Sequence, residues 1–183
     1  MRKVTVFFTA LAALVLAGCA AMTVSSHIER DVNFAEYVTY DWGPPDNLPV
    51  GDPRLDNNPF FRDYVQGAIE KRMAAKGYER ALTGTPDLLI HYHASVHQKL
   101  DVYEVDHGYG YCYGNCQPQV VDYEEGTLLI DVVDAKTSKV VWRGWAQDTM
   151  NGVIDNQDRL EKQVDDGVTR MMMLLPRGGA ALR

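Results

Sequence analysis

The chain has 183 residues and a formal net charge of −7. This length suits one folded domain after a targeting segment. The acidic balance argues against a nucleic-acid partner, because binding to phosphate backbones depends on clustered Lys and Arg. It also argues against electrostatic attachment to anionic lipid.

Residues 1–18 are typical of a cleaved lipoprotein signal peptide. Arg2 and Lys3 precede an apolar run over 4–16 that is too short to span a membrane. The run ends in Leu-Ala-Gly-Cys, which resembles a bacterial lipobox, in which Cys19 carries a diacylglyceryl group. An ordinary secretory signal with an incidental cysteine is the alternative. Ala20 favours an outer-membrane protein that faces the periplasm and is held by its acyl chains alone.

The mature chain begins with a lipidated linker over 19–23, followed by a single domain over 24–176 and a tail over 177–183. A short strand over 24–30 comes first. Asn33 can cap a single helical turn, after which Thr39 to Trp42 is extended. Four prolines between Gly43 and Asn58 predict a loop without regular structure.

A helix is expected to begin at Asn58-Pro59, a capping residue followed by proline at the first helical position. Its apolar side chains recur at helical spacing, at Phe61, Val65, Ala68, Ile69 and Met73. Gly77 ends the helix. A second helix, capped by Asp155 or Asn156 and stopped by Pro176, has its apolar face at Leu160, Val164, Gly167, Val168, Met171, Leu174 and Leu175.

Residues 87–97 predict a strand, whose side chains alternate between two faces. The inward face is expected to carry Leu88, Ile90, Tyr92, Ala94 and Val96, and the outward face Leu89, His91, His93, Ser95 and His97. The following segment, 100–126, has five tyrosines, four glycines, two cysteines, six carboxylates and no Lys or Arg. This composition predicts a long loop or irregular hairpin, and long loops in compact domains are often functional.

Residues 127–146 predict a β-hairpin, with two β-branched and aromatic runs around a polar break. Opposed residues share a face, so the hairpin pairs Val132 with Trp142 and Asp131 with Arg143. This register leaves a three-residue loop over 136–138, with Ser138 in a left-handed conformation.

Several motifs along the chain resemble those of the bacterial envelope lipoproteins catalogued as domain of unknown function 4136. They are Phe34, Tyr37, Thr39, Tyr40 and Trp42, then 76–78, 86–88, 126–128, Asp131, Asp134 and 142–144. The resemblance implies an α+β domain with a mainly antiparallel sheet and two main helices packed on one face. It implies no reaction, because the family has no agreed activity. The segment 100–126 is peculiar to this chain.

No catalytic motif occurs in the sequence, which predicts a protein that is not an enzyme and needs no cofactor. Asp131 and Asp134 could form a catalytic pair, but a cross-strand partner for Arg143 and a turn residue explain them better.

The sequence also leaves a metal site open. Same-face strand histidines lie roughly 6.5–7 Å apart, so His91, His93 and His97 could bind zinc or copper. The loop could supply further ligands from His107, Cys112 and Cys116, and the alternative function is then a periplasmic metal-binding lipoprotein. The alternative to a metal site is a polar outer sheet face. Cys112 and Cys116 are expected to form a disulfide in an oxidising compartment.

The main hypothesis is a non-catalytic binding or structural domain of the envelope. The segment 100–126 would contact another envelope protein with a basic surface, because tyrosines next to glycines give large contacts on an adaptable backbone. A disordered acidic loop is the alternative. The tyrosines concerned are Tyr103, Tyr109, Tyr111, Tyr113 and Tyr123.

Overall fold

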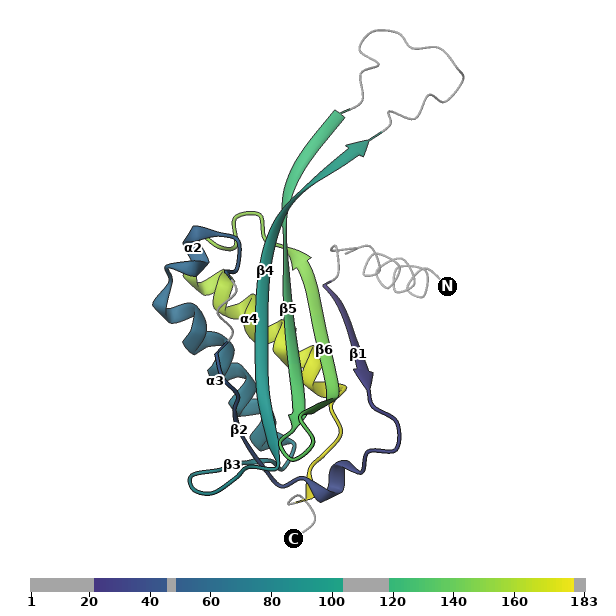
Figure 1. Ribbon diagram of the computed structural model, residues 1–183. Helices are drawn as coiled ribbons and strands as arrows, with labels where there is room; N and C mark the ends of the chain where they lie inside the picture. The colour runs from purple at the N-terminus through teal and green to yellow at the C-terminus, as the bar shows by residue number, and fades with distance from the viewer. Residues whose placement is uncertain (1–21, 46–48, 104–118, 180–183) are drawn as a thin grey trace, which may run out of the picture.

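The computed structural model describes residues 22–45, 49–103 and 119–179. It contains one six-stranded sheet in the order β1-β6-β5-β4-β2-β3 (Figure 1). The strands are β1 (Thr23–Ile28), β2 (Thr39–Trp42), β3 (Glu79–Arg80), β4 (Leu88–Tyr103), β5 (Gln119–Asp134) and β6 (Lys139–Thr149). The helical segments are η1 (Phe34–Glu36), α2 (Pro53–Asp56), α3 (Pro59–Ala75) and α4 (Gln157–Met173).

The strands β1, β6, β5 and β4 are antiparallel neighbours, whereas β2 is parallel to both β4 and β3. The two long helices, α3 and α4, cover one face of this sheet (Figure 1). The predicted α+β class, with a mainly antiparallel sheet and two main helices on one face, is therefore confirmed.

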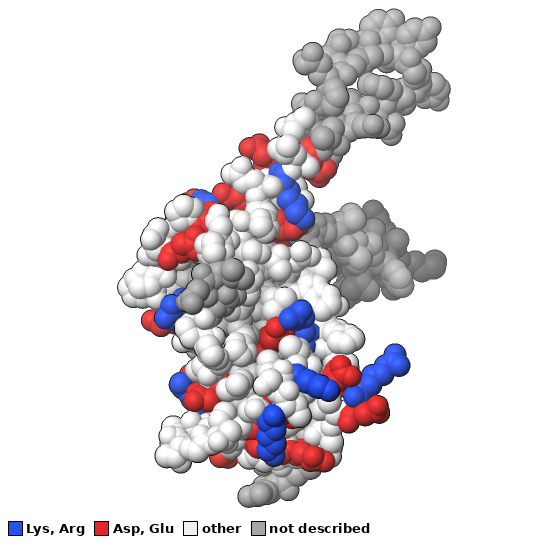
Figure 2. Space-filling view, in the orientation of Figure 1, with Lys and Arg blue, Asp and Glu red and all other residues white. Residues whose placement is uncertain are grey.

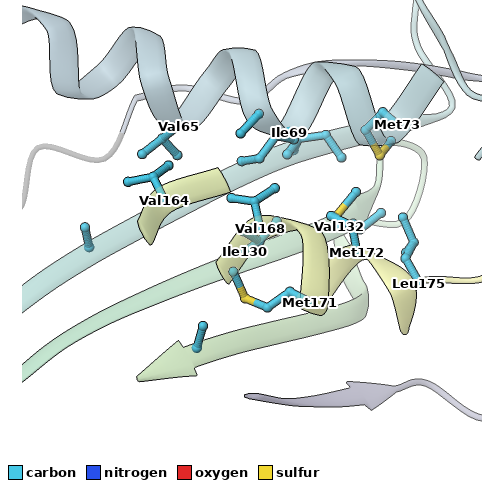
Figure 3. Close-up of a cluster of buried hydrophobic side chains, with 14 of the residues drawn as sticks. Val65, Ile69, Met73, Ile130, Val132, Val164, Val168, Met171, Met172 and Leu175 are labelled. Atoms are coloured by element: carbon cyan, nitrogen blue, oxygen red, sulfur yellow. The ribbon is translucent and has the colours of Figure 1, made fainter. Parts of the chain in front are cut away.

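The core lies between these helices and the sheet (Figure 3). The predicted apolar face of α3 is buried over its whole length, and the predicted inward face of β4 is buried except for the partly exposed Tyr92. The buried side chains in Figure 3 include Val65, Ile69, Met73, Ile130, Val132, Val164, Val168, Met171 and Met172. Between the helices, Arg72 binds Thr169 and Asp165 at 2.9 and 3.0 Å.

The predicted capping residues are in place. The side chain of Asn58 accepts from the Phe60 amide of α3, that of Asn156 from the Arg159 amide of α4, and that of Asn33 from the Ala35 amide of η1. The prediction for the end of α4 is wrong at two residues. Leu174 lies after the helix and is exposed, whereas Met172 is buried.

The central hairpin has the predicted register, because Val132 lies opposite Trp142 and Asp131 lies opposite Arg143. The turn differs from the prediction. Beyond Val132 the register shifts by one residue, so Val133 faces Val140 instead of Val141, and Val141 is buried whereas Val140 is exposed. The loop therefore has four residues, 135–138, and the left-handed residue in it is Ser138, with φ 56°.

One segment expected to lack regular structure contains a helix. Pro53–Asp56 forms the short helix α2, because Asp52 caps it and proline suits the first helical position. Within 100–126, where the sequence predicts a long loop or an irregular hairpin, residues 100–103 extend β4 and residues 119–126 belong to β5, so the described ends of the segment form a hairpin. Each strand supplies the other with backbone partners.

At the end of the sheet that holds the 135–138 turn, side chains join β2 to the hairpin. The Asp87 carboxylate accepts from the amides of Val38 and Thr39 at 3.0 Å. The Tyr37 hydroxyl donates to Asp134 at 2.8 Å. Burial and this hydrogen bond raise the pKa of Tyr37 to about 12, so the hydroxyl stays protonated at neutral pH.

Some predicted features lie outside the described residues. They are the signal peptide, the lipidated Cys19, the pair Cys112 and Cys116, and His107 with Tyr109, Tyr111 and Tyr113. Among the helices of the described ranges, none combines the length and apolar character needed to cross a bilayer.

Candidate functional site

The strands β4 and β5 continue past the rest of the sheet and form a two-stranded arm (Figure 1). We use the name arm for residues 98–103 and 119–124, which pair with one another. The last residue of β6, Thr149, lies opposite Glu125, so within the described residues no third strand accompanies the arm. Six residues per strand span roughly 20 Å.

Apolar side chains are exposed on both faces of the arm. Leu100 is 72% exposed and Val120 58%, and both lie on the face that carries Asp122. Val121, 44% exposed, lies opposite Asp101 on the other face. Figure 2 shows carboxylates next to uncharged surface along this part of the molecule. Large apolar side chains in a narrow, water-exposed ribbon are typical of an interaction surface.

The base of the arm is held by Arg54 of α2. Its guanidinium binds Asp52 at 2.6 Å, Glu124 of β5 at 2.6 Å and Asp155, just before α4, at 3.0 Å. The hydrogen bond from Arg54 lowers the pKa of Asp52, which is only 8% exposed. The hydrogen bond to Asp52, followed by that to Glu124, raises the pKa of Arg54. One side chain thus ties three segments together where the arm leaves the domain.

Further bonds fix the backbone at the same place. The Met150 amide donates to the Glu124 carbonyl, and the Glu124 amide donates to the Asn151 side chain, each at 2.8 Å. Lys99 pairs with Glu125 across the strands at 2.5 Å, and this hydrogen bond raises the pKa of Lys99. The arm therefore begins from a rigid base.

The predicted binding tyrosines are only partly placed. Tyr123 lies on the arm opposite Lys99 and is half-buried. The backbone of Tyr103 belongs to β4. Arg54 and the exposed Leu100, Val120 and Val121 were not predicted from the sequence. The alternation of apolar and polar residues over 100–102 was the available signal for the first strand of the arm.

The predicted metal ligands do not gather in the part of the chain that the structure describes. No group of three or more His, Cys, Asp or Glu side chains there could hold a metal ion. His91 and His93 line a pocket at the edge of β4, and His97 is exposed at the arm base. The Gly43 backbone covers the His91 ring, since a Cβ at Gly43 would lie 2.1 Å from it. The described residues therefore do not support the hypothesis that this protein binds a metal ion.

The carboxylates considered for catalysis have structural partners. Asp131 binds Arg143 through two hydrogen bonds of 2.6 Å, as the predicted register requires. Asp134 accepts from the amides of Lys136 and Thr137 at 2.9 and 2.7 Å, so it holds the turn. Both therefore stabilise the hairpin.

Solved structures match this chain at low sequence identity. A PDZ domain protein from Parabacteroides distasonis matches with a TM-score of 0.51 and 16% identity over 83% of this chain, which spans only 35% of that protein. PelC from Paraburkholderia phytofirmans, a dodecamer, gives a TM-score of 0.44 and 11% identity over 83% of this chain and 95% of its own.

A homolog of the neuraminyllactose-binding hemagglutinin from Helicobacter pylori gives a TM-score of 0.40 and 12% identity over 81% of this chain and 86% of its own.

No curated protein matches the sequence. A family model, described as a domain of unknown function, matches residues 24–177. This match covers nearly all of the folded part, and it confirms the resemblance inferred from the motifs. The chain belongs to the DUF4136 family.

Proposed function

We propose that this chain is a lipid-anchored, non-catalytic binding domain of the cell envelope, and that its arm contacts another envelope protein. The observation that carries the proposal is the arm itself. Its six residue pairs extend beyond the sheet, and its exposed apolar side chains contribute nothing to the buried core.

The physics of two-stranded ribbons supports a partner. An isolated hairpin is marginally stable at best in water, and three strands or a packed face are needed for more. Both long edges of the arm have backbone groups that a further strand could pair with. Covering Leu100, Val120 and Val121 would also remove apolar surface from water. A protein that packs on the arm would therefore stabilise it.

Charge indicates the kind of surface that fits. Glu124 and Glu125 already have basic partners, Arg54 and Lys99. Asp101 and Asp122 form no ion pair with a described residue. A partner with a basic patch would complement them, and its association would weaken as salt is added.

The position of the domain's first strand supports a partner near the membrane. Thr23 at the start of β1 pairs with Gln147, which pairs with Thr127, so the domain begins at the same end of the sheet as the arm. Only three residues lie between Cys19 and Thr23, so the two Cα atoms are at most about 14 Å apart. An acylated Cys19 would therefore hold the arm end near the bilayer, and the partner is a membrane protein or a neighbour on that membrane.

Site-specific photo-crosslinking in intact envelopes tests the proposal. A photoreactive residue replaces Leu100 or Val121 in the arm, and Leu82 serves as the control. Leu82 is 92% exposed and belongs to the turn between β3 and β4, at the far end from the arm. We expect the arm positions to yield one defined adduct that Leu82 does not yield and that decreases at high salt.

A shortened arm gives the second measurement. Replacing residues 100–122 by Asn-Gly keeps Lys99 opposite Tyr123 and leaves the contacts of Glu124 intact. The variant should unfold cooperatively as before, but the partner identified by crosslinking should no longer copurify with it. Equal adducts from Leu82 and Leu100, or unchanged copurification, would show that binding uses another surface.

A further inference from the structure

A second concave site lies away from the arm, at the edge of β4. It is a pocket of about 440 Å³ between this edge and the first turns of α3. It exists because β2 leaves the sheet early. The Gly43 amide donates to the Ile90 carbonyl of β4 at 2.9 Å, and the two prolines that follow have no amide to continue the ladder. Among the described residues, the next backbone bond at this edge runs from the Val96 amide to the Val50 carbonyl at 2.8 Å.

Two aromatic rings form a wall of the pocket. Trp42 and Tyr92 pack edge to face, with ring centroids 6.1 Å apart. The Trp42 indole nitrogen donates to Glu70 at 3.0 Å, so the ring is held in place. Burial raises the pKa of Tyr92, which keeps its hydroxyl neutral. Fixed aromatic surfaces of this kind pack well against a flat ring.

The charged side chains that line the pocket differ in whether they form ion pairs. Arg80 binds Asp41 at 3.3 Å and Glu70 at 3.0 Å. Arg62 hydrogen-bonds to Tyr92, and no ion pair joins it to a carboxylate of the described ranges. The lining carboxylate, Asp56, accepts from the Val50 amide at 2.7 Å. The guanidinium of Arg62, which has no carboxylate partner among the described residues, therefore lines the pocket.

The helix α3 adds to this positive character. Asn58, its N-cap, and Arg62, in its first turn, both line the pocket. The N-terminal end of a 17-residue helix carries a partial positive charge that favours an anion. The volume also lies within the range of about 300–1,000 Å³ that is usual for small-molecule sites.

We propose that this pocket binds a small organic anion that carries a ring. Its carboxylate or phosphate contacts Arg62 at the start of α3, and its ring packs against Trp42 and Tyr92. A planar guanidinium suits both anionic groups, because it can donate two parallel hydrogen bonds. This site is independent of the arm and of its partner.

Titrations of the full-length protein in detergent micelles, followed by ¹H–¹⁵N spectra, test the proposal. The Trp42 indole signal is assigned with Trp42→Phe and is compared with those of Trp142 and Trp145, which do not line the pocket. The probes are benzoate, D-glucuronate and phenyl phosphate, each paired with a neutral counterpart: benzamide, D-glucose and phenol. We expect at least one anion to shift the Trp42 signal in a saturable way, and its counterpart to have little effect.

Substitutions then identify the anion contact. Arg62→Gln should weaken binding roughly tenfold or more, and Arg62→Lys should weaken it less. Lys71→Gln, an exposed position on the same helix outside the pocket, removes the same charge and should leave binding unchanged. The proposal is overturned if no anion shifts the Trp42 signal selectively at millimolar concentration, or if Arg62→Gln binds like the unmodified protein.

Discussion

Replacing Arg54 by Ala tests the idea that one side chain holds the base of the arm. The substitution removes the ion pairs to Asp52, Glu124 and Asp155 in one step. In the unmodified protein the side chain of Asp52 is only 11% exposed, and after the substitution it keeps the backbone amide of residue 54 as its donor. A buried carboxylate is thereby left without its charged partner.

The expected loss follows from burial. Leaving a buried acceptor without its partner costs about 1–3 kcal/mol. The pair with Asp155, 65% exposed, adds at most about 1 kcal/mol because solvent screens it. We therefore expect the free energy of unfolding to fall by about 2–3 kcal/mol. Arg80→Ala is the matched control: Arg80 also binds two carboxylates, but all three side chains are at least 38% exposed. It should cost about 1 kcal/mol or less.

Urea unfolding at neutral pH measures both variants. Equal losses for Arg54→Ala and Arg80→Ala would refute the reasoning. The difference between Arg54→Ala and the unmodified protein should also depend on pH. Because the pKa of Asp52 is lowered in the folded state, the stabilisation is complete above its unfolded pKa of about 3.9. It is lost as the pH falls through the lowered value.

Three further predictions use the same protein. Trp142→Ala should cost roughly 3–5 kcal/mol in urea unfolding because Trp142 is 1% exposed, whereas Trp145→Ala on the open sheet face should cost much less; similar losses would contradict the assigned faces. Cys19→Ser should abolish labelling by a fatty-acid analogue, and equal label on both proteins would exclude acylation at Cys19. Cys112 and Cys116 should resist alkylation until reduced in protein from oxidising envelope, so two free thiols found by mass spectrometry would exclude the disulfide.

Most of the fold was predicted from local patterns, each of which lies within a single segment of the sequence. Opposed residues share a face of a sheet, and this rule, together with the polar break at 135–138, paired Asp131 with Arg143. It failed at the turn for a local reason. Asp134 accepts from two amides of the turn, and its carbonyl accepts from Ser138 at 2.8 Å, which favours a four-residue loop. The register must then shift by one residue, and Val141 becomes the buried side chain.

The candidate sites were less predictable, because tertiary structure creates them. The edge pocket brings together Trp42, Arg62 and Tyr92, which belong to three elements and share no sequence motif. The arm was hidden by the composition of the whole segment 100–126, since its carboxylates and glycines argue against strands. Its strand conformation comes from pairing across 16 consecutive residue pairs that start inside the core.

The polar contacts that join β2 to the hairpin lie far from the arm, so the fold of this family can include such an arm without losing them. Tyr37, Asp87 and Asp134, all among the motif residues, join β2 to the hairpin at the end of the sheet away from the arm. The helices cover the sheet between the two ends (Figure 1). Changes beyond Lys99 and Tyr123 therefore remove no buried contact from the core. The arm can vary in length and side chains at little cost to folding. Under the proposed function, the specificity of the arm for its partner would therefore change while the rest of the domain stays the same.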